Sequence, residues 1–255
     1  MLTNKKKMIM KKIIGILVVT LMLVSCSEED SQNVSTITYY PEFQIMGDDV
    51  IFLDKGQEFV DPGVIATEGD TEIPFTTTVT GKYRGGTTVD TNVVDIYQIV
   101  YTAVNQDGFS GSVARTVYVI ETGDLTTSIA GLYSSTVFRN GTSGAQYTDM
   151  EYVLIWQNAD GSYEISDAFA GWYSIGRAIA GSDSPGGIIV ANNIATNDFS
   201  FPGTLTNDYF GGVVNITDLT VDAPTKKLTL KTTWIAPGSP PTNYEFVATL
   251  TQIPL

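Results

Sequence analysis

The sequence VDIYQIVYTAVNQDGFSGSVARTVYVI, which spans residues 94–120, gives the clearest indication of the fold of the region around it. Residues 94–104 and 113–120 alternate or run apolar over strand-like lengths, and they are rich in valine, isoleucine and tyrosine, which favour pleated structure. After the first run, Asn105-Gln106-Asp107-Gly108 has the turn chemistry of a hairpin. The stretch therefore predicts two antiparallel strands joined by a turn.

Short apolar runs separated by turns continue on the N-terminal side of this hairpin. They cover residues 50–53, 59–66 and 75–80, and Asp54-Lys55-Gly56 is one of the turns between them. This spacing fits a sandwich of about seven strands. The chain is rich in Thr, Val, Ile, Tyr and Gly and, outside its first 25 residues, poor in helix formers, so we predict an all-β protein.

A second β-rich unit is expected from residue 125 to residue 255. Its last strands flank residues 237–241, which contain Gly and Pro, and should pair as a hairpin, with residues 213–221 as the strand before them. Such a meander predicts a second antiparallel β sandwich or a small barrel. Alternating positions place three sets of side chains each on one strand face: Tyr152, Leu154 and Trp156; Leu228, Leu230, Thr232 and Trp234; and Tyr244, Phe246, Ala248 and Leu250.

The N-terminus has the pattern of a lipoprotein signal peptide. Five lysines lie before the apolar residues 13–24, and Leu23-Val24-Ser25-Cys26 places small or apolar residues before the one cysteine of the chain. An apolar segment of about a dozen residues is too short for a membrane span of roughly 20 residues. We predict that residues 1–25 are removed and that Cys26 is lipidated; the alternative is an ordinary thiol at the end of a signal anchor.

The remaining chain is strongly acidic. Removal of residues 1–25 takes away five of the 14 basic residues and none of the 28 acidic residues, so the formal net charge becomes −19. A surface this acidic disfavours nucleic acid and anionic headgroups as partners, whereas neutral partners such as uncharged glycans remain compatible.

Three motifs, GQEFVDPGV (56–64), YQIVYTA (97–103) and ARTVYV (114–119), resemble the immunoglobulin-like domain of bacterial surface proteins over about residues 42–121. The resemblance implies an immunoglobulin-like sandwich in which the Asp61-Pro62-Gly63 turn and the strand containing Arg115 are structural signatures. The acidic run Ser27-Glu28-Glu29-Asp30 resembles the export tag of Bacteroidota lipoproteins. This second resemblance implies an anchor in the outer membrane that faces the cell exterior.

Motifs of the second unit, IAGLY (129–133), YEISD (163–167) and GWY (171–173), resemble the uncharacterised C-terminal domain that accompanies this immunoglobulin-like domain in Bacteroidota surface lipoproteins. That family has no established chemistry. The resemblances imply one architecture for the chain, made of a signal peptide (1–25), an acylated tether (26–41), an immunoglobulin-like domain (42–122) and a C-terminal β-rich domain (125–255).

Residue types that several kinds of catalysis require are missing from the sequence. It contains no histidine, and its single cysteine is expected to be acylated, which excludes serine–histidine triads, cysteine proteases and the usual zinc sites. A hydrolase would have to use carboxylates, and Glu164 with Asp167 is the pair to consider. Because this spacing points the two side chains to opposite faces, we predict no catalytic residue, no metal and no cofactor.

Aromatic residues offer a better indication of ligand binding. In the glycine-flanked segment 167–173, Trp172 and Tyr173 could form an exposed platform for a sugar ring beside the polar side chain of Asp167. The alternative is that these rings pack in the core, which is the commoner location of a tryptophan. Tyr147 and Tyr209 are weaker platform candidates.

Three functions are compatible with these observations. The first is a non-catalytic, glycan-binding accessory of a polysaccharide-uptake system, held in the membrane by its N-terminal lipid, with a neutral polysaccharide as ligand and an outer-membrane transport protein as partner. The second is a structural or adhesive surface module that binds a protein. The third and least favoured is a carboxylate-dependent glycoside hydrolase.

Overall fold

The computed structural model describes residues 38–254. The predicted signal peptide (1–25), the lipidation site Cys26 and the tether as far as residue 37 lie outside the described residues. Residues Tyr40–Leu255 form one compact unit. Within the described part of the chain, no helix is long and apolar enough to cross a membrane.

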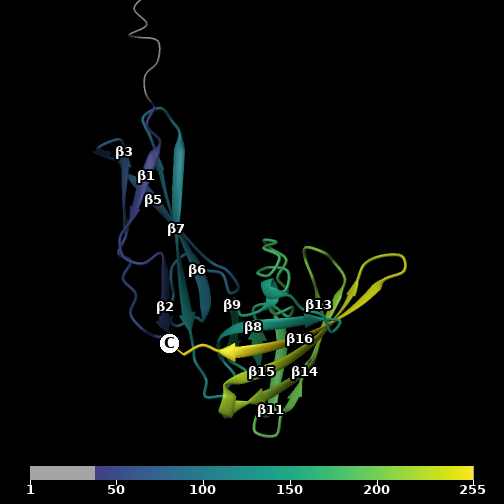
Figure 1. Cartoon of the computed structure of the whole chain (residues 1–255). Coiled ribbons are helices and arrows are strands. Elements are labelled where there is room, and N and C mark those ends of the chain that lie inside the picture. The colour runs from purple at the N-terminus through teal and green to yellow at the C-terminus, as the bar shows by residue number, and fades with distance from the viewer. Residues whose placement is uncertain (1–37, 255) are drawn as a thin grey trace, which may run out of the picture. The chain divides into compact units, whose positions relative to one another are not determined.

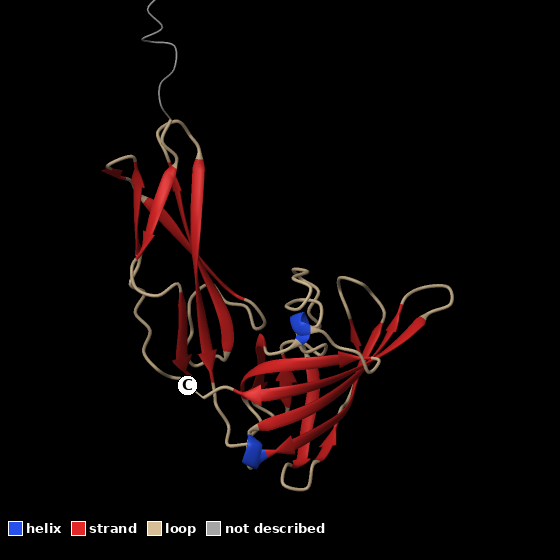
Figure 2. Cartoon of the chain, in the orientation of Figure 1, coloured by secondary structure: helices blue, strands red, loops and turns tan. Residues whose placement is uncertain are grey.

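The predicted all-β class is confirmed. Strands dominate residues 38–254, and the helical elements described there are two 3₁₀ turns, η2 (Ala145–Tyr147) and η3 (Ala223–Thr225) (Figure 2). The composition explains this result, because β-branched and aromatic side chains pack well on pleated surfaces.

The N-terminal half is an immunoglobulin-like sandwich of two sheets (Figure 1). One sheet has the order β1-β3-β4 and the other β2-β7-β6-β5, with β2 parallel to β7. The predicted hairpin is β6 and β7, whose turn is closed by a hydrogen bond from Asn105 N to Phe109 O. The strands of this half are β1 (Pro41–Ile45), β2 (Val50–Asp54), β3 (Val64–Glu68), β4 (Thr71–Glu72), β5 (Phe75–Gly81), β6 (Asp95–Val104) and β7 (Ser110–Ile120).

A buried arginine connects distant segments of this sandwich by hydrogen bonds. Arg115 of β7 is fully buried and its guanidinium donates to the carboxylate of Asp61 and to Tyr101 Oη. Asp61 also accepts the Tyr101 hydroxyl at 2.7 Å and the amide of Gly63 at 3.0 Å. Burial, together with the neighbouring carboxylate, raises the pKa of Tyr101. These contacts give Asp61 and Arg115 the structural role that the resemblance implied.

The C-terminal half is one nine-stranded antiparallel sheet in the order β12-β11-β10-β9-β8-β16-β15-β14-β13. The sheet curls into a half-barrel, and β11 approaches β14 so closely that a Cβ on Gly187 would lie 2.5 Å from Ile216 Cδ1. Of the two architectures predicted, the barrel-like one is found. The strands are β8 (Gly131–Arg139), β9 (Met150–Gln157), β10 (Tyr163–Ile165), β11 (Gly187–Asn193), β12 (Asp198–Ser200), β13 (Leu205–Thr206), β14 (Val213–Asp222), β15 (Lys227–Ala236) and β16 (Thr242–Gln252).

The predicted strand faces are confirmed, but they belong to two different cores. The alternating sets on β15 and β16 face the core of the half-barrel. The set on β9 faces a second cluster, in which Leu154 and Trp156 pack with Val94 and Ile120 of the immunoglobulin-like half. Trp156 is buried, as predicted, within that shared cluster.

Candidate functional site

The inner face of the half-barrel is covered by residues 166–184, which we call the plug segment. Buried side chains of the sheet hold its backbone, since Ser135 Oγ donates to Ala170 O and Thr232 Oγ1 donates to Ala168 O, both at 2.7 Å. Phe169 of the plug segment belongs to the main core cluster and is completely buried. The segment is thus part of the core and not an exposed loop.

Asp167 organises the plug segment and is not exposed. Its carboxylate accepts hydrogen bonds from the amides of Phe169, Gly171 and Ser184 at 2.9–3.0 Å and from Ser174 Oγ at 2.9 Å. Burial raises the pKa of Asp167, and the four hydrogen bonds act in the opposite direction. The prediction that Asp167 offers a polar group to a sugar is not met, because its oxygens already accept four donors within the fold.

The exposed platform expected at Trp172 and Tyr173 is also not what the structure contains. These side chains are 3% and 4% exposed. The Trp172 ring stacks on Tyr147 with 3.5 Å between centroids, and Tyr173 packs edge-on against Phe169 and Trp234. Two large rings stabilise the fold more by filling an open half-barrel than by facing water, so core packing prevails here.

A cationic side chain lies where β8 ends. Arg139, the last residue of β8, is half-buried, and its Nη1 donates to Tyr173 Oη at 3.1 Å. Its guanidinium carbon is 5.1 Å from the ring centroid of Trp172 and 4.9 Å from that of Tyr244. Such distances are typical of cation–π contacts.

A second arginine reaches the same rings from the plug segment. Arg177 is exposed, its Nε donates to Tyr147 Oη at 3.1 Å, and its guanidinium carbon lies 5.5 Å from the centroid of Tyr173. Arg139 and Arg177 therefore meet around one tyrosine. We call this group the rim cluster, and it consists of Arg139, Tyr147, Trp172, Tyr173, Arg177 and Tyr244.

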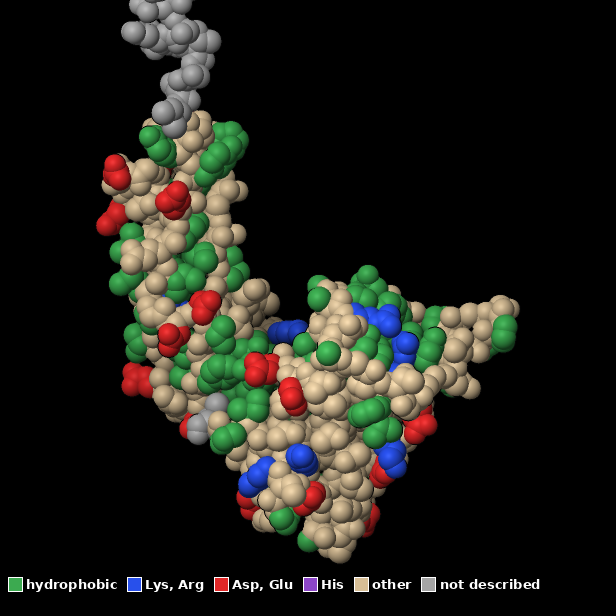
Figure 3. Space-filling view, in the orientation of Figure 1, with side chains coloured by type: hydrophobic (Ala, Val, Ile, Leu, Met, Phe, Trp, Pro, Cys, Tyr) green, Lys and Arg blue, Asp and Glu red, His purple; other side chains and the backbone are tan. Residues whose placement is uncertain are grey.

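The charge of the rim cluster is not balanced by a carboxylate. Four other basic side chains form ion pairs in the structure, whereas neither Arg139 nor Arg177 pairs with an acidic group among residues 38–254. Burial, the largest single influence, raises the pKa of Tyr147, but hydrogen bonds with Arg177 and Gln146 and the charges of both arginines together outweigh it and lower that pKa. Figure 3 shows basic side chains among hydrophobic ones on the upper part of the C-terminal half.

An open groove adjoins the rim cluster at the start of β16. It has a volume of ≈ 540 Å³, within the range of small-molecule sites. Tyr244 belongs to both features, and its ring stacks on Trp234 of β15 with 5.4 Å between centroids. The residues that line the groove are Asn140, Thr233, Trp234, Ile235, Asn243, Tyr244 and Glu245. Because neighbouring residues of a strand point to opposite faces, the rings of Trp234 and Tyr244 pack on the inner face of the sheet, and the other strand residues present their side chains to the groove on the outer face. Amide, hydroxyl and carboxylate groups beside the exposed apolar side chain of Ile235 can bind a polar ring compound such as a sugar.

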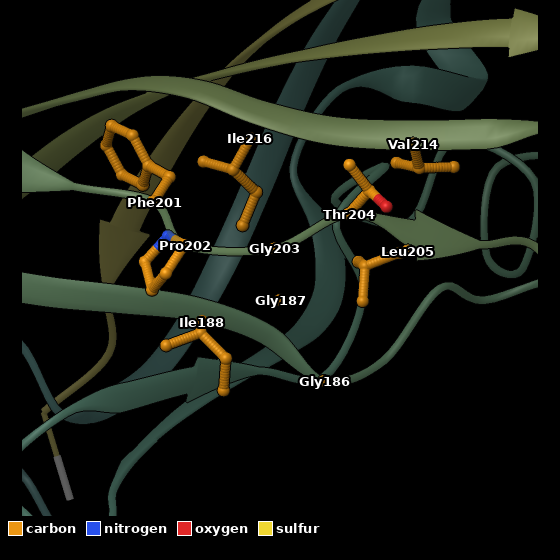
Figure 4. Close-up of a pocket in the computed structure, with 10 residues that line it drawn as sticks. All are labelled: Gly186, Gly187, Ile188, Phe201, Pro202, Gly203, Thr204, Leu205, Val214 and Ile216. Carbon is orange, nitrogen blue, oxygen red and sulfur yellow. The ribbon is translucent and has the colours of Figure 1, made fainter.

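A smaller cavity lies between β11 and β14, where these two strands of the half-barrel approach each other (Figure 4). Its volume is ≈ 120 Å³, below the range usual for ligand sites. Apolar side chains such as Phe201 and Leu205 and the backbone of Gly186 and Gly187 line it, without a charged group. The cavity is better suited to a few waters than to a ligand.

The residues of the candidate site that the sequence did not single out are Arg139, Arg177, Asn243 and Tyr244. Tyr244 appeared in a set of core-facing residues, and the two arginines are far apart in the chain. The rarity of basic residues in so acidic a sequence was the one available signal. The described residues contain no group of histidine, cysteine or acidic side chains suited to a metal ion.

Comparisons with known proteins agree with this architecture. A family model for a bacterial surface protein immunoglobulin-like domain matches residues 43–119, and a family model for a C-terminal domain matches residues 122–252. Neither description names a catalytic activity. Comparison with the curated proteins gave no match.

Among solved structures, the chain is similar to the lipoprotein BT2262 from Bacteroides thetaiotaomicron. The two are 27% identical with a TM-score of 0.57, and the match covers 84% of this chain and 100% of that one. These findings confirm the predicted resemblance to Bacteroidota surface lipoproteins with an N-terminal immunoglobulin-like domain.

Proposed function

Because this chain belongs to the family defined by the C-terminal domain that matches residues 122–252, we propose that it is a lipid-anchored, non-catalytic protein of the cell surface that binds glycans in the groove beside β16. The likeness to a lipoprotein and the match to a surface immunoglobulin-like domain support the location. The observation that carries the binding function is the groove itself, whose polar lining residues are Asn140, Thr233, Asn243 and Glu245.

The proposed anchor is Cys26 in the outer membrane, with the domains facing the exterior. Metabolic labelling with a radioactive fatty acid should mark the wild-type protein and leave Cys26→Ser unlabelled. Proteinase K added to intact cells should digest the protein if it faces outward. Labelling of Cys26→Ser, or full protection until the outer membrane is opened, would contradict the anchor or the orientation, respectively.

Glycan binding is tested by electrophoresis of the protein lacking residues 1–26 in gels that contain soluble polysaccharides. We expect retardation by at least one glycan, and we expect Asn243→Ala and Ile235→Ala to reduce it. Tyr209→Ala is the matched control, because Tyr209 is a 58% exposed tyrosine that does not line the groove. Equal retardation of all four proteins would place binding elsewhere.

A protein-binding surface module is the second candidate. Phe138, Val213 and Ile235 are exposed large apolar side chains on the strands of the half-barrel, and burial of Trp172 and Tyr173 removes the platform that favoured a sugar. Absence of retardation across neutral and acidic polysaccharides would favour this function over glycan binding. An outer-membrane transport protein is the partner we propose for either function.

A further inference from the structure

Four neighbouring strands of the half-barrel, β8, β16, β15 and β14, bury one side and leave the other exposed over most of their length (Figure 1). Along each strand buried residues alternate with partly or fully exposed ones, apart from a bulge in β14. The pairing register joins the exposed positions into rows that cross the sheet. We call this surface the outer face, and the groove beside β16 lies on it.

One row of the outer face consists of threonines. It takes one residue from each strand, in the order Thr220, Thr229, Thr249 and Thr136. With strands about 4.8 Å apart, the row extends over about 14 Å. The hydroxyl of Thr136 accepts a hydrogen bond from the amide of Asp149 at 3.1 Å, and the other three hydroxyls form none within residues 38–254. Three hydroxyl groups are therefore available to a ligand, each as donor and acceptor.

Apolar side chains lie between the threonine row and the groove. Phe138 of β8 pairs with Val247 of β16, and its side chain is 46% exposed. Val247 comes two residues after Glu245, which lines the groove, and two residues before Thr249, so these three side chains share one face of β16. The groove is thus one end of a longer surface that carries both apolar and hydroxyl groups.

The outer face carries little net charge in a strongly acidic chain. Lys231 of β15 forms an ion pair with Asp218 of β14 at 2.9 Å. The hydrogen bond and charge of Asp218, with a smaller effect of Glu245 on the neighbouring strand, raise the pKa of Lys231. From the threonine row to the groove, one lysine therefore lies close to the two carboxylates of this surface. Its other groups are mostly hydroxyl, amide and apolar, and they complement an uncharged polyhydroxylated ligand better than a polyanion.

The composition of the outer face also bears on the kind of ligand. Residues that contribute most to protein–protein binding are tryptophan, tyrosine and arginine, whereas threonine and valine are under-represented among them. Among the residues that the structure describes, the rows from the threonines to the groove contain none of those three types and one phenylalanine, Phe138. A sugar has C–H faces that pack on an aromatic ring and hydroxyls that pair with threonine and asparagine side chains. The outer face therefore favours a glycan over a protein.

We propose that the groove is one end of an extended site on the outer face, and that this site binds a neutral polysaccharide over several consecutive sugar units. The polysaccharide runs along β15 and β16 from Ile235 to Thr229, a distance of about 20 Å, which exceeds the length of a single sugar ring. Phe138 and Val247 pack against its ring faces, and the threonine row binds its hydroxyls. This inference rests on the proposed glycan-binding function, and it names the ligand class and the residues outside the groove that recognise it.

The first experiment measures how affinity depends on ligand length. The protein lacking residues 1–26 is run in gels that contain dextran, soluble starch, galactomannan or mixed-linkage β-glucan. The two-sugar and six-sugar fragments of each retarding polymer are then compared by isothermal titration calorimetry. We expect the six-sugar fragment to bind at least about 10-fold tighter, and added salt to leave its affinity unchanged because the ligand is uncharged. Equal affinity for both fragments, or a loss of affinity with salt, would overturn the proposal.

Variants then test the residues outside the groove. Thr229→Val and Thr249→Val remove a hydroxyl but keep a β-branched shape, and Phe138→Ala removes the ring. Each should weaken binding of the six-sugar fragment about 3- to 10-fold, as expected for one hydrogen bond or for partial burial of a phenylalanine side chain. Thr78→Val and Phe109→Ala are the matched controls in the immunoglobulin-like half, because Thr78 is an exposed strand threonine and Phe109 is also 46% exposed. Unchanged affinity in all three folded variants, checked by circular dichroism, would also overturn the proposal.

The outcomes separate this inference from the function on which it rests. Binding of a polymer that depends on Ile235 and Asn243, with equal affinity for both fragments and no effect of Phe138→Ala, would support the groove and contradict the extended site. Binding that none of the groove or outer-face variants alters would contradict both. Absence of retardation by every polymer would likewise contradict both.

Discussion

At the scale of single residues, the candidate site depends on partners that are distant in the sequence. In the sequence, Asp167 is a polar residue that could contact a ligand. In the structure, three amides and one hydroxyl of the plug segment donate hydrogen bonds to its carboxylate oxygens. Arg139 has no such signal in the sequence and becomes part of the rim only because β8 ends beside Tyr244. Whether one of these side chains can bind a ligand therefore depends on whether its hydrogen-bonding groups already have partners within the fold.

Tyr147 reports the electrostatic potential of the rim cluster. Its pKa is lowered by hydrogen bonds with Arg177 and Gln146 and by the charges of Arg177 and Arg139, in spite of burial, so it should ionise at a lower pH than an ordinary tyrosine. Arg177→Gln removes both the hydrogen bond and a charge and should raise that pKa, which means that ionisation of Tyr147 shifts to higher pH. The ¹³C chemical shift of the Tyr147 ring carbon, followed by NMR against pH, measures this shift.

The same titration of Arg84→Gln is the control and should match the wild type. Identical titration of Tyr147 in the wild type and in Arg177→Gln would show that the arginine does not set the potential of the cluster.

At the scale of elements, the plug segment and η2 pack against each other with little free space between them. Gly176 lies against η2, and a Cβ at this position would be 2.5 Å from Tyr147 Cδ1 and 2.9 Å from Gln146 O. Tyr147 in turn stacks on Trp172. The rim cluster therefore depends on one close approach between two short elements.

Gly176→Ala should destabilise the protein by about 1–3 kcal/mol, as expected for overpacking in a tight region. It should also displace Tyr147 from Trp172, because the backbone oxygen of Gln146 leaves little freedom to relax. Thermal unfolding measures the loss, and near-ultraviolet circular dichroism detects the change at the rings.

Gly144→Ala is the control for this prediction. A Cβ at Gly144 meets the same tyrosine at an ordinary 3.8 Å, so both readouts should stay near the wild-type values. If Gly176→Ala and Gly144→Ala behave alike, the close approach does not limit the position of η2.

At the scale of the whole molecule, the immunoglobulin-like half and the half-barrel share a hydrophobic cluster. Trp156 of β9 stacks on Tyr83 with 5.7 Å between centroids, and Tyr152 packs edge-on against Phe52 and Tyr118. Lys82 adds an ion pair to Asp183 of the plug segment. These contacts predict that the two halves unfold together.

Trp156→Ala should cost about 3–5 kcal/mol, the usual effect of removing a buried tryptophan. It should also weaken the coupling, so that calorimetry shows two transitions in place of one. Phe138→Ala, at a side chain that is 46% exposed, is the control and should unfold like the wild type. A single transition at the wild-type temperature in Trp156→Ala would contradict the coupling.

Local patterns along the chain were sufficient to predict the all-β class, the β6–β7 hairpin and the alternating faces of β9, β15 and β16. These features depend on local turn chemistry and on a period of two, both of which can be read along the chain. The family resemblance likewise followed from contiguous motifs such as those around Asp61 and Arg115.

Long-range packing, in contrast, sets which buried face belongs to which core and where the candidate site lies. Alternation shows that Trp156 and Trp234 face apolar surroundings, but not that the first contacts the other half of the molecule while the second packs inside the half-barrel. Trp172 and Tyr173 became core because the half-barrel has an open inner face that large rings can fill. Arg139 and Arg177 met because two distant segments converge on one tyrosine, and such a long-range contact has no local signature.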